Sequence, residues 1–237
     1  MTTLILNGAE ANAFLSKFTS SYIESLKSPV YLGNHGYASD GRIAIKVGVL
    51  SVEDSPDTKN AANIDAFMDA FDGAEPMPAA FAECVADKGL REKFDERVRE
   101  AVEQSKSELE SVTVEKCPHC GEPIWIRDGE VLSEKTMEQM SEDATPEVAR
   151  RDTSMPVVFE LDSERQFIIG YRYAIMLVEA CGIDGEYRVG TLCGSREAVW
   201  GRSKDGSVQC VLMQMRAHTE LGEDVPRVKL YENGGAA

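Results

Sequence analysis

Two cysteines are the residues whose type and spacing most clearly predict chemistry in this sequence. Cys117 and Cys120 enclose a Pro-His dipeptide and a glycine follows directly, so the backbone is free to turn tightly and bring both sulfurs to one point. Zinc ribbons use such a turn because a tetrahedral zinc ion takes two thiolates from it and two more ligands from elsewhere. The stretch resembles half of a zinc ribbon, with Cys117 and Cys120 as candidate zinc ligands.

Three interpretations of this cysteine pair stay open. A second Cys-x-x-Cys is missing, so the turn is either a knuckle without metal or a zinc site completed from elsewhere, such as a second chain. The third interpretation is a redox pair, which requires a helix N-terminus after a strand. Residues 124–126 instead predict a strand, followed by a hairpin turn at Asp128 and Gly129. This pattern argues against redox catalysis.

Motifs typical of enzymes are missing from the sequence. It has no glycine-rich phosphate loop ending in Lys-Ser or Lys-Thr, no paired histidines near a glutamate at helical spacing, and no serine nucleophile elbow. Three histidines provide few general bases. We therefore expect a protein that is not an enzyme.

The composition predicts a folded, acidic protein. With 43% hydrophobic positions in 237 residues, the chain is long enough to bury a core. Its 25 Lys and Arg residues against 41 Asp and Glu residues give a net charge of -16, which argues against a surface that wraps nucleic acid or anionic lipid. Apolar runs fall short of the roughly 20 residues of a membrane span, and no secretion signal follows Met1. We expect a cytoplasmic protein without a membrane partner.

Charge divides the chain into three segments. Residues 1–50 sum to +1, residues 51–155 to -14, and residues 156–237 to -3. We interpret 1–50 and 156–237 as one discontinuous domain, interrupted by an acidic insertion at 51–155. Within the insertion, apolar residues at helical spacing predict helices over 61–71 and 90–112, and the hairpin with the cysteine pair follows.

Both end segments predict the same order of elements: a strand, a helix and three strands. Two such β-α-β-β-β units allow both helices to pack on one side of a combined sheet, which predicts an α+β fold. Asp40-Gly41 and Asp205-Gly206 mark tight hairpin turns. The expected strands lie at 2–6, 29–32, 36–39, 42–50, 157–161, 187–193, 198–202 and 208–216. The expected helices are one that follows a capping box at Asn7 and Glu10 and extends to Tyr22, and one over 167–181.

Motifs in both end segments resemble the bacterial DNA polymerase III beta sliding clamps. The stretch SPVYLGNHGYASDGRIAIKV at 28–47 is similar to the first unit of a clamp domain. The ending REAVWGRSKDGSVQCVLMQMR at 196–216 is similar to the last hairpin of these clamps, which ends in a VLMPMR-like strand; Gln214 occupies the proline position here. RQFIIGYRYAIMLVEACG is similar to the helix that precedes it. The insertion has no counterpart in this resemblance.

The resemblance implies a clamp-like domain of a single-domain, phage or prophage type. Family clamps are rings of six such domains, so a ring made of this chain needs about six copies and implies a homo-oligomer. The inner helices of the family present Lys and Arg to the DNA backbone. The candidates for DNA binding here, on the two expected helices, are Lys17, Lys27, Arg165 and Arg172.

Two functions of different classes follow from the sequence. The first is a non-catalytic, sliding-clamp-like accessory or scaffold protein that acts on DNA or on replication proteins. The alternative is an acidic, phage-type interaction or inhibitor module, in which the insertion binds a basic surface of a host protein and mimics nucleic acid. DNA binding that weakens with salt favours the first function. A monomer that ignores DNA at low salt favours the second.

Overall fold

The computed structural model divides the chain into two compact units. Unit 1 comprises residues 1–87 and 156–237, and unit 2 comprises residues 88–155. The strand expected at 2–6 lies outside the described residues except for Leu6, which forms an isolated parallel bridge with Val49. The structure describes residues 6–50, 52–120, 122–192, 196–215 and 224–231.

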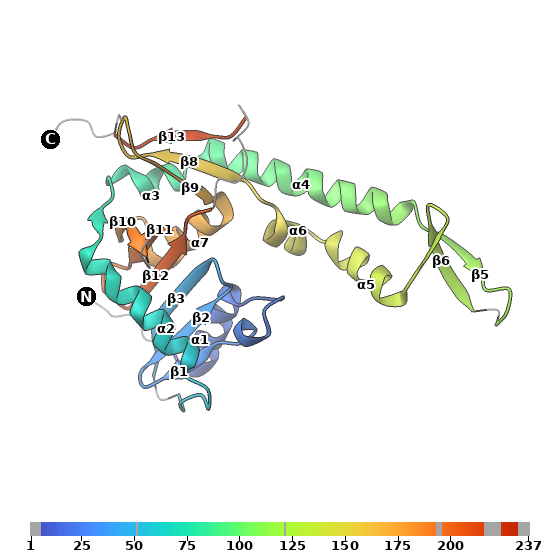
Figure 1. Cartoon of the computed structure of the whole chain (residues 1–237), viewed down its shortest axis with the longest axis horizontal. Coiled ribbons are helices and arrows are strands. Elements are labelled where there is room, and N and C mark those ends of the chain that lie inside the picture. The colour runs from blue at the N-terminus through green and yellow to red at the C-terminus, as the bar shows by residue number, and fades with distance from the viewer. Residues whose placement is uncertain (1–5, 51, 121, 193–195, 216–223, 232–237) are drawn as a thin grey trace. The chain divides into compact units, whose positions relative to one another are not determined.

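Unit 1 is built on a seven-stranded antiparallel sheet with the order β1-β2-β3-β12-β11-β10-β4 (Figure 1). Two three-stranded meanders, one from each end segment, meet in the centre of this sheet, where β3 pairs with β12 and Ile45 lies opposite Cys210. The predicted α+β class and the joining of both end segments in one sheet are therefore confirmed. The strands are β1 (Val30–Leu32), β2 (His35–Ser39), β3 (Ile43–Gly48), β4 (Glu75–Pro76), β10 (Glu186–Leu192), β11 (Arg196–Arg202) and β12 (Val208–Met213). Of the strand expected at 208–216, Arg216 lies outside the described residues.

The two predicted Asp-Gly turns close the hairpins β2–β3 and β11–β12. Gly41 and Gly206 have φ angles of 89° and 73°, which glycine adopts at little cost because it lacks a Cβ. The Asp40 carboxylate accepts hydrogen bonds from the backbone N–H groups of Arg42 and Ile43 at 2.9 and 3.0 Å. These contacts fix the register of the strands on either side.

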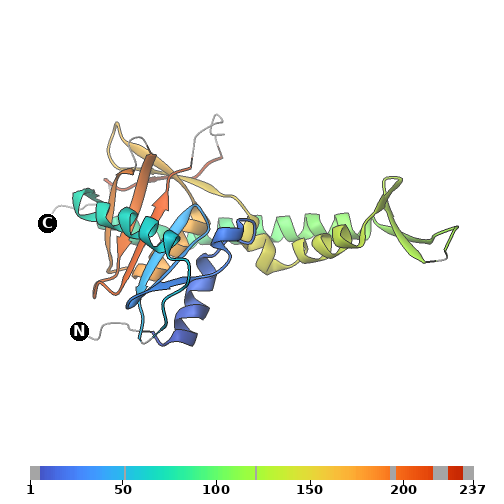
Figure 2. The ribbon, with the colours of Figure 1, turned by 60° about the horizontal axis from the view of Figure 1, so that its bottom comes forward.

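Helices cover both faces of the seven-stranded sheet (Figure 2). On one face, α1 (Gly8–Leu15) contacts β2, and α7 (Tyr171–Cys181) contacts β11 and β12. A Cβ at Gly36 would meet Leu15, and one at Gly201 would meet Leu177. Gly36 is the cross-strand partner of Val47, and Gly201 is the cross-strand partner of Cys210. Val47 and Cys210 lie on the paired strands β3 and β12 at positions that share a face. Because cross-strand partners point to the same side, Gly36 and Gly201 belong to one face of the sheet. The two end-segment helices thus lie on one side, as the duplicated order predicts.

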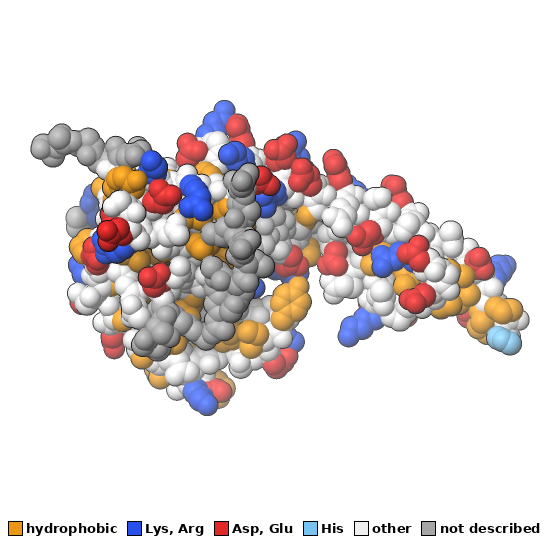
Figure 3. Space-filling view, turned by 45° about the horizontal axis from the view of Figure 1, so that its top comes forward, with side chains coloured by type: hydrophobic (Ala, Val, Ile, Leu, Met, Phe, Trp, Pro, Cys, Tyr) orange, Lys and Arg blue, Asp and Glu red, His pale blue; other side chains and the backbone are white. Residues whose placement is uncertain are grey.

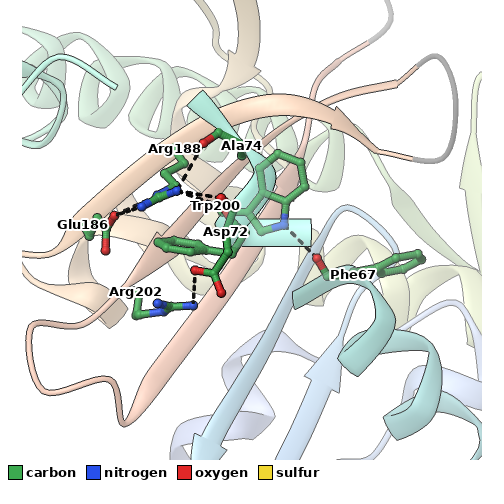
Figure 4. Close-up of polar contacts among 8 residues, drawn as sticks. Phe67, Asp72, Ala74, Glu186, Arg188, Trp200 and Arg202 are labelled. Atoms are coloured by element: carbon green, nitrogen blue, oxygen red, sulfur yellow. Dashed lines mark hydrogen bonds and ion pairs between the residues drawn. The ribbon is translucent and has the colours of Figure 1, made fainter. Parts of the chain in front are cut away.

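The opposite face carries α2 (Lys59–Met68) and the short 3-10 helix η3 (Asp69–Gly73). Tyr37, Trp200 and Val211 of the sheet form one buried cluster with Ile64 and Met68 of α2. The indole Nε1 of Trp200 also donates to the Phe67 carbonyl at 2.8 Å (Figure 4). The helix predicted over 61–71 is thereby found, with its last turn tightened into η3.

The boundary of the insertion differs from the expected one because residues 52–87 pack into unit 1. Arg188 of β10 donates to the carbonyls of Phe71, Asp72 and Ala74, at 3.4, 3.1 and 3.3 Å (Figure 4). The α3 helix (Ala80–Val85) is tied to α7, since the Tyr171 hydroxyl donates to the Val85 carbonyl at 2.7 Å. The division therefore falls at 87/88, whereas the charge pattern placed it at 50/51.

A smaller sheet of unit 1 corrects the expected second β-α-β-β-β unit. Here β8 (Pro156–Glu160) pairs with β9 (Gln166–Gly170), and β13 (Arg227–Lys229) joins β8 in parallel. The predicted strand at 157–161 is found, but outside the seven-stranded sheet. The helix expected over 167–181 begins only at Tyr171. Residues 167–170 are all buried in β9, and a short apolar run fits a strand as well as a helix.

The first expected helix is also shorter than its apolar spacing predicts. The capping box at Asn7 and Glu10 is present, but α1 ends at Leu15 and continues only as η1 (Ser16–Phe18). The Thr19 hydroxyl donates to the Ser16 carbonyl at 2.9 Å. Such side-chain hydrogen bonds of Ser and Thr compete with the backbone hydrogen bonds of a helix. A second 3-10 helix, η2 (Glu24–Leu26), follows, and Tyr22 is 76% exposed.

Unit 2 contains a helical part and a small sheet. In α4 (Lys88–Glu110), which confirms the helix predicted over 90–112, the buried residues recur every four positions and form one apolar stripe. The helices α5 (Glu134–Asp143) and α6 (Pro146–Asp152) contact α4, and Arg150 pairs with Asp95 at 2.6 Å. The small antiparallel sheet consists of β5 (Thr113–Lys116), β6 (Pro123–Arg127) and β7 (Glu130–Leu132).

The contact between α7 and the sheet at Gly201 provides a test of the packing. A Cβ at Gly201 would lie 2.8 Å from the Cys181 sulfur and 3.0 Å from Leu177. We expect Gly201→Ala to lower the free energy of unfolding by about 1–3 kcal/mol through overpacking. Gly73→Ala, where nothing lies within 4 Å, is the control and should change it by less than about 0.5 kcal/mol. Equal effects in denaturant titrations would contradict the placement of α7.

Candidate functional site

The candidate DNA-binding lysines lie on separate short segments. Lys17 is exposed in η1. Lys27 directly follows η2, and its Nζ pairs with the Glu24 carboxylate at 2.5 Å, three residues earlier on the chain. Neither lysine is part of a regular α-helix, which corrects the expected position on helix one. The α1 helix itself carries Glu10 and no cation.

Arg165 lies in the turn between β8 and β9 and not on a helix, which corrects its expected position. Its guanidinium binds both carboxylate oxygens of Glu75 at 2.6 and 3.0 Å, and its Nε donates to Asp162 at 2.6 Å. Hydrogen bonds from Arg165 lower the pKa of both carboxyls, and these two carboxylates raise the pKa of Arg165. Two carboxylates of unit 1 thus engage this cation, which leaves little of its charge for a phosphate.

Arg172 is the one candidate cation found on an α-helix, in the first turn of α7. Its guanidinium lies 5.1 Å from the ring centroid of Tyr173, and that of Arg42 lies 5.8 Å from the same ring. These distances are typical of cation–π contacts. The exposed Glu179 lies two turns further along α7. The four candidate cations therefore occupy four different segments of unit 1.

The cysteine pair lies in the turn between β5 and β6, as the sequence predicts. Cys120 is exposed and Cys117 is half-buried, and both are free thiols. The backbone N–H of Cys117 donates to the Glu122 carbonyl at 2.8 Å and closes the turn. Hydrogen bonds from the backbone of Cys120 and His119 lower the pKa of the Cys117 thiol, so its thiolate, the form that binds metals, is favoured. Within the described residues, no group of three or more His, Cys, Asp or Glu side chains is arranged to hold a metal ion.

A polar cluster that the sequence did not reveal joins α2 to the sheet. Lys46 of β3 donates to Asp65 of α2 at 2.7 Å, and the Tyr37 hydroxyl donates to the other oxygen of the same carboxylate at 2.9 Å. Tyr37 and Lys46 are cross-strand partners in β2 and β3. Strand periodicity alone predicts that these two side chains share a face, but the partner from α2 depends on tertiary packing.

A cavity of about 470 Å³ lies beside this cluster. His35 and Lys46 line it together with the turn residues Asn34 and Ser207 and with Gln209 of β12. Burial, followed by the charge of Lys46, lowers the pKa of His35, while burial and the bond to Asp65 raise the pKa of Tyr37 far above its usual value. At neutral pH His35 is therefore uncharged and Tyr37 keeps its proton. The cavity offers hydrogen-bond donors and acceptors to a small polar molecule.

Comparison with known proteins does not indicate a function, so a function has to be inferred from this geometry. No protein-family model, curated protein or solved structure matches the chain. Among the described helices, none combines the length and the apolar character that crossing a membrane requires.

The Asp65 carboxylate is the centre of the polar cluster and can be tested by removal. Asp65→Ala leaves the partly buried Lys46 ammonium and Tyr37 hydroxyl without their common acceptor. We expect the free energy of unfolding to fall by about 1–2 kcal/mol more than in Asp69→Ala, a value reduced for the partial exposure of the pair. Asp69, an exposed residue of η3, is the matched control. If both variants unfold at the same denaturant concentration, the cluster does not hold α2 on the sheet.

Proposed function

We propose that this chain is a non-catalytic interaction protein that binds a basic surface of a partner protein through an acidic surface on unit 1. The acidic surface consists of the exposed carboxylates of the segment 52–87, which includes α2, η3 and α3. The partner is a protein of the host or of the replication machinery.

The charge of this segment is the observation that carries the proposal. Residues 51–87 contain nine acidic side chains and one basic side chain, Lys59. Asp65 is half-buried in the polar cluster, while the other eight carboxylates are exposed. Such an excess raises the association rate with a basic partner through long-range attraction. The exposed acidic residues are Glu53, Asp54, Asp57, Asp69, Asp72, Glu75, Glu83 and Asp87.

The acidic segment is fixed on the sheet at several points. Trp200 binds the Phe67 carbonyl, Arg188 binds two carbonyls of η3 and that of Ala74, and Arg202 pairs with Asp72 at 3.4 Å (Figure 4). The Phe71 ring contacts both arginines, with its centroid 4.8 Å from the Arg188 guanidinium and 3.8 Å from that of Arg202. A surface on a fixed scaffold loses less conformational entropy on binding than a disordered acidic tail does.

The distribution of cations favours a protein partner over the DNA backbone. Unit 1 has a net charge of -10 and unit 2 a net charge of -6. Among the described side chains on the face shown in Figure 3, Lys and Arg are interspersed with Asp and Glu and do not gather in one broad basic patch. Binding to DNA requires several cations that are available to phosphates, whereas Lys27 and Arg165 pair with carboxylates of their own chain.

Neutralising the acidic surface tests this proposal. The variant Glu53→Gln, Asp57→Asn, Asp69→Asn, Glu83→Gln removes four exposed charges without changing side-chain size. A basic partner protein is first captured with the wild-type chain and identified. We expect the variant to bind this partner about tenfold more weakly, because attraction at the acidic surface is lost. Affinity is measured by calorimetry at two salt concentrations.

A control with the same change in net charge makes the test specific. Glu96→Gln, Glu100→Gln, Glu103→Gln, Glu110→Gln removes four exposed carboxylates of α4 in unit 2, and the affinity of the partner should stay within about twofold. Equal losses in both variants would show that net charge, and not the acidic surface, governs binding. An affinity that does not depend on salt would refute an electrostatic interface.

The second candidate function is a sliding-clamp-like accessory protein. Its support is the joining of two three-stranded meanders through β3 and β12, with one helix from each end segment on the same face. This duplicated arrangement is what the clamp resemblance implies. In such an assembly of about six copies, every chain contributes its own Lys17 and Arg172. Weak contacts of each chain with DNA phosphates therefore add up over the assembly.

DNA binding and native mass separate the two functions. If the chain is a clamp, its native mass is several times 26.0 kDa and duplex DNA binds at low salt. Lys17→Gln combined with Arg172→Gln then reduces the slope of affinity against salt by about two phosphate contacts per chain. Under our first proposal, the chain does not bind duplex DNA even at low ionic strength, and the double variant binds its protein partner as the wild type does.

A further inference from the structure

The small sheet of unit 2 lacks a core of its own. No residue of β5, β6 or β7 is buried, and Val114 and Val131 are each 64% exposed. A hydrophobic core is the main source of stability for an isolated sheet, and very small domains without one commonly depend on a metal or a disulfide. The sheet carries its cysteine pair at the turn between β5 and β6, where such a constraint acts on both strands.

The turn that carries the cysteine pair is closed by backbone pairing on both sides. Lys116 and Pro123 are the last paired residues of the hairpin, and the N–H of Cys117 donates to the Glu122 carbonyl beyond them. Cys117 and Cys120 therefore lie at the end of this hairpin, after β5 and before β6, and both strands are labelled in Figure 1.

The chain supplies half of a tetrahedral ligand set. Zinc in structural sites takes four ligands, with Zn–S distances of about 2.3 Å. Cys117 and Cys120 provide two, and in the described part of the chain no third His, Cys, Asp or Glu is arranged with them to form a site. A zinc site at this turn needs two more ligands, and a second molecule can supply them.

We propose that two copies of this chain bind one zinc ion between them through Cys117 and Cys120 of each copy. A two-fold axis through the ion relates the two knuckles and gives a closed tetrahedral set of four thiolates. Four thiols lose their protons to solvent as four Zn–S bonds form, and the site has a formal charge of -2. No oxidant or reductant takes part. The zinc ion thereby links two copies through unit 2 and stabilises both hairpins.

This proposal does not depend on the acidic surface of unit 1. If the acidic surface binds a partner protein, the zinc-linked dimer presents two copies of that surface and increases the avidity for a multivalent partner. If the acidic surface has no partner, the metal-dependent dimer is unaffected. The two proposals therefore fail separately.

Zinc titration of the purified, reduced full-length chain tests the proposal. The probe is zinc chloride alone, and the readouts are bound metal and native mass. We expect one zinc ion per two chains, a mass of twice 26.0 kDa at saturation, and reversal by a chelator. With cobalt in place of zinc, the absorption bands of a tetrahedral thiolate site should appear in parallel with dimerisation.

Three variants assign the ligands. Cys117→Ser with Cys120→Ser should abolish both the bound metal and the change in mass. Cys84→Ser, which removes a half-buried thiol of α3 in unit 1, and His119→Gln should leave both unchanged. One zinc ion per chain without dimerisation, loss of binding in His119→Gln, or no bound metal at all would overturn the proposal. A dimer that forms only under oxidation and dissociates with a reductant would do so as well.

Discussion

The pairing of β3 with β12 is the interaction on which the architecture of unit 1 depends. It joins a meander from the first fifty residues to one from the last fifty-two, with Ile45 opposite Cys210 at the centre of the sheet. Only the continuous sheet gives α1 and α7 a common face and gives α2 a surface formed by both halves, where Tyr37, Trp200 and Val211 meet. Each half alone would leave an unpaired central strand edge exposed to water.

Local sequence patterns predicted much of this fold, and tertiary contacts decided the rest. The Asp-Gly turns, the capping box at Asn7 and Glu10 and the stripe of α4 were recognised because their signals lie within a few residues. Residues 167–170 were wrongly placed in a helix, since a buried strand and a buried helix share the same apolar run. Charge grouped 51–87 with the insertion, although Arg188 and Trp200 bind this segment to the sheet.

The candidate site also has one part that local sequence patterns predicted and another that depends on tertiary contacts. The turn that carries Cys117 and Cys120 was predicted from their spacing, because a tight turn is encoded by residues close together in the sequence. The roles of Arg165 and Lys46 could not be predicted, since their partners Glu75 and Asp65 come from distant parts of the chain. In these long-range pairs, cations of unit 1 bind carboxylates of the same unit, while exposed carboxylates remain in excess on the acidic surface. This distribution of charge favours our proposal of an interaction protein over binding to DNA.

Hydrogen exchange at single backbone amides tests the central pairing most directly. If β3 and β12 hold the two end segments together, their hydrogen-bonded amides exchange only when unit 1 unfolds as a whole. Their opening free energies then agree with each other and with that of global unfolding. Protection in β12 that is lost independently of β3, at an opening free energy several kcal/mol lower, would contradict this dependence. It would mean that the two end segments fold as separate bodies.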